Sequence, residues 1–197
     1  MAEPRFRKAI TAIDNANAAD PNLIHIDGGE RPKELAHAER VSRWLEKLTP
    51  DASEELKLAG RAHHIERWIL PRNQYPDGRD GYLDWRRKLQ HHHAQRAGEI
   101  LKAAGYPEDS IQRVQDILQK KRLRRDPEVQ AFEDALCLVF LETQLHDIAS
   151  RLTTEKTVDV LRLTLPKMSA QGREAAMGIE LALEDKQLLE QAVRGSD

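Results

Sequence analysis

The sequence predicts an all-α protein, a single compact domain over residues 1–197 with about seven or eight helices. Three observations support this prediction. Apolar residues recur at helical spacing through long stretches, and proline and glycine stand at the boundaries between those stretches. No two segments show the alternation of apolar and polar residues that is typical of paired strands.

The composition favours a soluble globular protein, because 32% of the residues are charged and 40% are hydrophobic. A net charge of −2 gives no reason to expect general adhesion to nucleic acid. The single cysteine, Cys137, excludes an internal disulfide and suits a reducing compartment. We expect no secretory leader, because charged residues interrupt residues 1–19, and no membrane span, because no apolar run approaches the ~20 residues that cross a bilayer. We therefore expect a cytoplasmic protein without membrane contact.

The N-terminal part contains one predicted helix, a long loop and a second helix. Residues 6–19 carry a modest apolar stripe that stops at Asp20-Pro21. Residues 22–31, with Asp27-Gly28-Gly29, are expected to form a loop, long enough to border a functional site. The second helix covers residues 32–48 and has His37 at the edge of its stripe.

The third predicted helix, residues 52–70, is apolar on nearly every side and is therefore expected at the centre of the fold. Its second half nevertheless carries His63, His64 and Glu66. Polar groups in such a place need partners. Pro71 ends the helix, and the loop that follows is rich in turn residues and arginines.

The fourth helix is expected from about Tyr82 to Ala104, and of its three consecutive histidines only His93 falls on the apolar stripe. A fifth helix ends in a basic run at residues 120–125. A sixth runs from Asp126-Pro127 to about residue 150, with Glu133-Asp134 at the edge of seven consecutive apolar residues. Closing helices are expected over residues 157–165 and 170–193.

These polar positions suggest a metal site with four predicted ligands, His37, His63, His64 and Asp134. Imidazole and carboxylate groups on rigid elements bind manganese, iron, cobalt or zinc. The alternative for each histidine is an ordinary hydrogen-bonded core residue, and for Asp134 a helix-packing hydrogen bond or salt bridge.

The order of these residues resembles the HD-domain superfamily of metal-dependent phosphohydrolases. His37-Ala38-Glu39-Arg40-Val41 resembles its first motif, His63-His64-Ile65 stands where its His-Asp pair would be, and Asp134-Ala135-Leu136 resembles its closing aspartate motif. The stretch from His93 to Leu101 is similar to a further histidine motif. The resemblance covers residues 32–145 and implies an HD-like core, with helices 6–19 and 155–193 packing on it, and hydrolysis of a nucleotide or related phosphoester.

The sequence departs from that pattern at His64, which replaces the paired aspartate. Because a neutral imidazole binds one metal where a carboxylate can bridge two, a single-metal site, or an otherwise altered one, is expected in place of the superfamily's two-metal site. A closer resemblance, carried by Arg72-x-x-Tyr75-Pro76 and by Gly81-Tyr82-Leu83-x-Trp85-Arg86, is to the uncharacterised family called domain of unknown function 4202.

Two residues are candidates for proton transfer. Glu66 lies one turn from His63 and could act as a general base or orient a ligand, and His93 could share the proton chemistry. For Glu66 the alternative is a salt bridge. Arginines and aromatic residues around the following loop suit phosphate recognition and base stacking; they are Arg72, Tyr75, Arg79, Trp85 and Arg86. The alternative is a solvated loop with Trp85 in the core.

The basic run could contact RNA through Lys120, Lys121, Arg122, Arg124 and Arg125. Positive charge at an exposed helix end is the alternative. Three functions therefore remain open: a metal-dependent hydrolase, which we favour; a nucleotide- or RNA-binding regulatory module on a degenerate HD scaffold; and a structural helical protein that docks through its basic helix end.

Overall fold

The described residues are helical apart from one short hairpin, so the all-α fold class expected from the sequence is confirmed. The structure is a computed structural model and describes residues 4–26 and 28–194. Its elements are α1 (Pro4–Ala18), β1 (Leu23–Ile26), β2 (Gly29–Pro32), α2 (Lys33–Leu48), α3 (Glu54–Ala62), 3-10 turns at Arg67–Ile69 and Arg72–Gln74, α4 (Gly78–Ala104), α5 (Glu108–Leu118), α6 (Pro127–Ala149), α7 (Thr154–Thr164), a 3-10 turn at Leu165–Lys167, α8 (Ala170–Met177) and α9 (Leu183–Arg194).

The chain divides into two compact units. The first contains residues 1–43 and 51–121, and the second contains residues 44–50 and 122–197. The expectation of a single domain stays a prediction.

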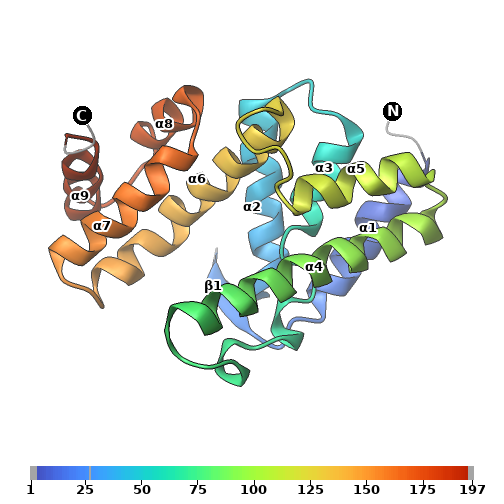
Figure 1. Ribbon diagram of the computed structural model, residues 1–197, viewed down its shortest axis with the longest axis horizontal. Helices are drawn as coiled ribbons and strands as arrows, with labels where there is room; N and C mark the ends of the chain where they lie inside the picture. The colour runs from blue at the N-terminus through green and yellow to red at the C-terminus, as the bar shows by residue number, and fades with distance from the viewer. Residues whose placement is uncertain (1–3, 27, 195–197) are drawn as a thin grey trace. The chain divides into compact units, whose positions relative to one another are not determined.

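In the first unit, α4 and α5 run side by side, and both contact α3, while α1 packs on α3 and α4 (Figure 1). The apolar stripes predicted for these helices form the core, in which the largest fully buried side chains include Ile13, Leu56, Leu58, Ile65, Leu101 and Ile117. The candidate site of this unit lies on these elements and on the N-terminal part of α2.

The expected loop at residues 22–31 is instead an antiparallel hairpin, in which Leu23 pairs with Pro32 and Ile26 with Gly29. Each strand has four residues, too few for a clear alternating pattern, and Leu23 is 52% exposed. Gly28 has a φ of 79°, a conformation that glycine adopts without strain. Asp27 lies outside the described residues.

The third helix is shorter than predicted, since α3 ends at Ala62 and not at residue 70. His63 and His64 lie in the turn that follows, and Glu66 has a left-handed φ of 54°. Consecutive residues on an α-helix do not face each other. Because the chain leaves the helical path at His63, the rings of His63 and His64 can stack on one another.

In the second unit, α6 contacts α7, α8 and α9, and α7 packs along α9 (Figure 1). Asp126 caps α6 by accepting hydrogen bonds from the N–H groups of Glu128 and Val129, as its place before Pro127 predicts. The closing segment 170–193 differs from expectation, because it is split into α8 and α9.

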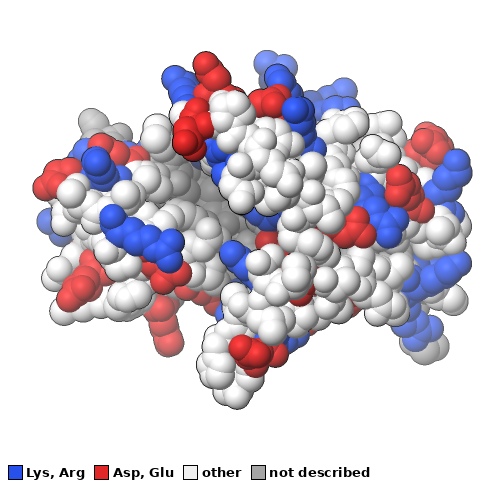
Figure 2. Space-filling view, turned by 90° about the horizontal axis from the view of Figure 1, so that it is seen from below, with Lys and Arg blue, Asp and Glu red and all other residues white. Residues whose placement is uncertain are grey.

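Lys and Arg side chains are interspersed with Asp, Glu and uncharged residues on the face seen in Figure 2. Among the described residues, no helix is long and apolar enough to cross a lipid bilayer.

Candidate metal centre

Four histidine rings gather in the first unit: His37 on α2, His63 and His64 after α3, and His93 on α4. The ring centroids of His63 and His64 are 3.9 Å apart, and His37 stacks on His64 at 4.5 Å. The ring of His93 lies 5.8 Å from that of His64. Potential ligand atoms of His37, His63 and His64 all lie within 4.8 Å of one another, so one ion could bind all three after a small contraction.

Hydrogen-bond partners fix the tautomer of His64. An Arg67 nitrogen lies 3.0 Å from Nε2, and because a guanidinium only donates, Nε2 must accept. The ring proton is therefore on Nδ1, which donates to a Glu34 carboxylate oxygen at 3.0 Å. A carboxylate on the far nitrogen of a histidine is the arrangement that orients imidazole ligands in metal proteins.

The ring of His93 is oriented in the same way by a backbone carbonyl. Its Nδ1 lies 2.8 Å from the carbonyl oxygen of Ile65, which can only accept, so Nε2 carries a lone pair. In the described part of the chain, the buried Nε2 atoms of His93 and His37 have no hydrogen-bond partner. Buried polar atoms are normally paired, so two unpaired nitrogens in one cluster are available to bind a ligand.

All four rings are neutral at pH 7, which is the form that binds metals. Burial is the largest cause in each case. It lowers the pKa of His37 to about 4 and that of His93 to about 3. The pKa values of His63 and His64 are also held well below 6.5 by burial and by neighbouring imidazoles and cations.

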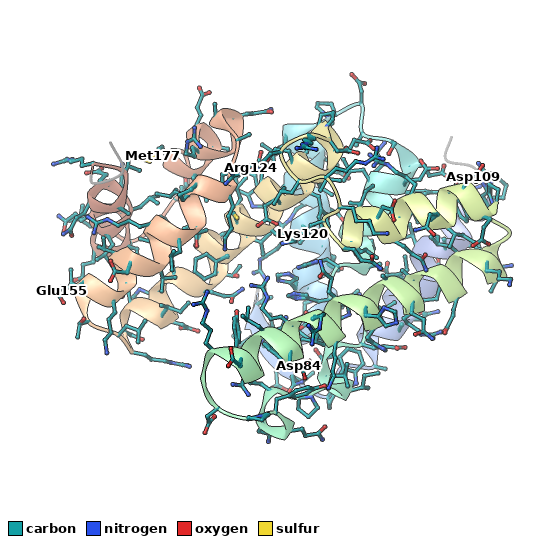
Figure 3. All side chains as sticks on the ribbon, in the orientation of Figure 1. Asp84, Asp109, Lys120, Arg124, Glu155 and Met177 are labelled. Carbon is teal, nitrogen blue, oxygen red and sulfur yellow. The ribbon has the colours of Figure 1, made fainter. Side chains whose placement is uncertain are left out.

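The cluster lies among cations and one buried carboxylate. After burial, Arg67, Arg40 and Lys33 are the groups that lower the pKa of His37, and Lys120 lowers that of His63. Lys120 follows the end of α5 (Figure 3). Glu34 is 6% exposed, and burial raises its pKa to about 7 against the opposing effect of Arg67. This excess of positive charge favours an anionic ligand.

The Glu66 carboxylate contacts two side chains of α4. It accepts a hydrogen bond from Arg96 Nε at 2.9 Å and lies 3.6 Å from His92 Nε2. The salt-bridge alternative weighed from the sequence is thus present, with Arg96 as the partner. The roles of Glu66 and His93 in proton transfer stay predictions.

The arginines and aromatic residues after the histidine pair have mainly local contacts. Arg72 donates to the carbonyl oxygen of Tyr75 at 2.9 Å, and the Arg86 guanidinium lies 5.7 Å from the ring centre of Tyr82. Trp85 is 8% exposed and donates to the carbonyl oxygen of Leu70. Tyr75 lies beneath the amine of Lys88, and Arg79 is exposed. Substrate binding by these five residues stays a prediction.

Asp134 belongs to the second unit, where its carboxylate holds the beginning of α8. It accepts hydrogen bonds from the backbone N–H of Ser169 at 2.8 Å, from the Ser169 hydroxyl, and from Gln130 Nε2 at 3.0 Å. Asp134 is 2% exposed, so these bonds compensate for its burial. The helix-packing alternative is therefore present, and ligation of a metal by Asp134 stays a prediction.

Sequence reasoning missed Glu34 and Arg67. Glu34 precedes His37 by three residues on α2, and Arg67 follows His64 by three residues. The first spacing puts two side chains on one helical face and could have indicated Glu34. The position of Arg67 depends on the left-handed turn at Glu66, which the sequence does not reveal.

The fold and the cluster define an all-α protein with a candidate metal centre made of neutral histidines. The chain belongs to the family described as Domain of unknown function (DUF4202), which matches residues 7–189. The closer of the two resemblances is thereby confirmed, while the likeness to HD domains stays a prediction. Comparisons with curated proteins and with solved structures found no match.

Proposed function

We propose that this protein is a metal-dependent hydrolase of phosphoesters, with one divalent ion held by His37, His63 and His64. The observation that carries the proposal is the convergence of three neutral imidazoles, with potential ligand atoms within 4.8 Å of one another. A bound ion of this kind acidifies a coordinated water and polarises a phosphoryl oxygen. An all-imidazole set favours zinc or iron over manganese, which prefers carboxylate oxygens.

The residues around the cluster supply the remaining functions of such a site. Glu34 holds the His64 ring through Nδ1, and the Ile65 carbonyl holds the His93 ring. His93 Nε2, a neutral acceptor, is available to orient a water molecule by accepting its hydrogen bond. Lys33, Arg40 and Lys120 contribute the positive potential that attracts an anionic phosphoester, such as a nucleotide. We also propose that the helices around the cluster have an HD-domain-like arrangement.

The direct test combines elemental analysis with an activity panel. Protein purified without added chelator is expected to contain about one zinc or iron ion per chain, as a three-histidine site binds one ion. It should release phosphate or nucleoside from part of a nucleotide panel, and this activity should disappear with chelator and return with metal. Protein with neither bound metal nor metal-dependent hydrolysis would refute the proposal.

A second candidate function is contact with RNA through the turn after α5. Three non-glycine residues there, Lys120, Arg122 and Arg124, have positive φ angles of 54°, 61° and 71°. Each residue in the left-handed conformation costs on the order of 1 kcal/mol, which suggests that this backbone conformation has a function. Arg122 and Arg124 are exposed in this turn, where their guanidinium groups could contact phosphates.

This candidate predicts salt-dependent binding of a single-stranded RNA oligonucleotide. Replacing both Arg122 and Arg124 with alanine should weaken binding and reduce the slope of log K against log salt by roughly 1.4, because each lost phosphate contact removes about 0.7. Arg87 and Lys88, paired with Asp84 on α4, provide the control for equal loss of charge. Equal slopes in the two double variants would contradict specific contact.

A further inference from the structure

Arg67 occupies the nitrogen that the proposed ion needs. Its guanidinium lies 3.0 Å from Nε2 of His64, while Nδ1 of the same ring is taken by Glu34. One lone pair cannot serve a guanidinium N–H and a metal at once. His64 can therefore join His37 and His63 as a ligand only when Arg67 has moved away.

The contacts of Arg67 are consistent with such a movement. Its carboxylate neighbour, Glu34, is 3.9 Å from Nε, which is too long for a hydrogen bond. The guanidinium also lies over the indole of Trp85, 5.0 Å from the ring centre. The side chain is 34% exposed, so it can turn toward solvent without crossing the core.

We infer that Arg67 is the phosphate-binding residue of this site, held on His64 until a divalent ion displaces it. The inference rests on the proposed function. A displaced guanidinium stays beside the ion, because Arg67 follows His64 by three residues. Its planar fork can then bind two oxygens of one phosphate. The ion and the phosphate should consequently bind with positive cooperativity, each strengthening the other by the same factor.

Trp85 provides a reporter of the movement that does not depend on activity. Loss of the cation above its indole should change its fluorescence. The other two tryptophans, Trp44 and Trp68, are replaced with phenylalanine to isolate this signal. Zinc is titrated into the double variant, and zinc affinity is measured separately by competition with a chromophoric chelator. The fluorescence change is expected to saturate at the same zinc concentration as binding.

Arg67→Met tests the role of the guanidinium, since methionine keeps an unbranched stem without donors. Zinc should bind this variant on the order of tenfold more tightly, because no hydrogen bond to His64 must be broken. The Trp85 signal should no longer respond to zinc. The zinc-loaded variant should bind methylphosphonate, a non-hydrolysable phosphate analogue, at least about tenfold more weakly than the wild type. Arg87→Met, on an exposed part of α4, is the matched control and should behave as the wild type.

The outcomes separate this inference from the proposed function. If the wild type and Arg67→Met bind zinc with equal affinity, and zinc does not change the Trp85 fluorescence, the proposed role of Arg67 is wrong. The metal centre itself would then still be supported, because both proteins bind zinc. Absence of zinc binding in every variant would refute the metal centre, and the inference would fall with it. If Arg67→Met does not fold, Arg67→Lys keeps the charge but not the fork, and it should still lose affinity for methylphosphonate. Unchanged affinity in that variant would also overturn the inference.

Discussion

Replacing His37 with alanine is expected to remove the bound ion and to lower metal-dependent hydrolysis by more than about a hundredfold. Loss of a residue that merely orients a metal ligand costs roughly 10- to 100-fold in affinity or activity, so loss of a ligand should cost more. The fold should survive, because the substitution removes a buried nitrogen that has no hydrogen-bond partner among the described residues. Elemental analysis after dialysis and initial rates provide the measurement.

His91→Ala is the matched control for this variant. His91 is an exposed histidine on α4, two residues before His93, so its removal changes the same chemistry outside the cluster. It should retain both metal and activity. Equal metal content in His37→Ala and His91→Ala would show that the ring on α2 is not a ligand.

The second large effect is expected at Asp134, on stability. Alanine at this position leaves the Ser169 N–H and the Ser169 hydroxyl without their acceptor, while the Gln130 amide keeps the carbonyl oxygen of Lys167. Each buried group left unpaired costs about 1–3 kcal/mol, so a loss of about 2 kcal/mol or more is expected in urea unfolding. If Asp134 only holds α8, the metal content of the Asp134→Ala protein under native conditions should equal that of the wild type. Loss of the ion from folded Asp134→Ala would instead establish it as a ligand.

Gly172 allows the same contact to be disturbed without changing the carboxylate. A Cβ atom at Gly172 would lie 2.6 Å from the Asp134 carboxyl carbon, so Gly172→Ala should destabilise the protein by about 1–3 kcal/mol. At Gly178 the nearest atom would be 3.5 Å away, an ordinary contact, and Gly178→Ala should have little effect. Similar urea midpoints for the two variants would show that α8 shifts easily to accommodate the methyl group.

The helical core was predictable because burial imposes a 3.6-residue period on the sequence. The stripes around Leu58, Ile65 and Val114 are buried as expected, and His93 alone of its triplet is buried, while His91 is exposed. The hairpin was not predictable, because its four-residue strands contain too few side chains to show a period of two. Short segments of this kind depend on pairing with one another and not on their own pattern.

The histidine cluster was predictable in membership but not in geometry. Polar residues on apolar stripes identified His37, His63 and His64, which do lie together. The end of α3 at Ala62 was missed because nothing in the apolar pattern marks it, and no glycine or proline follows it before Pro71. Because the helix end was missed, the positions of Arg67 and Glu66, which the turn determines, were missed as well.

The left-handed backbone at Glu66 restricts which residues evolution can place immediately after the histidine pair. Valine, isoleucine and threonine are strongly disfavoured at a φ of 54°, whereas glycine, asparagine and aspartate adopt it most readily. Residue 66 therefore has a short list of tolerated substitutions for steric reasons alone. A narrow amino-acid repertoire at this position among relatives would reflect the path of the main chain, and by itself would be no sign that the carboxylate takes part in catalysis.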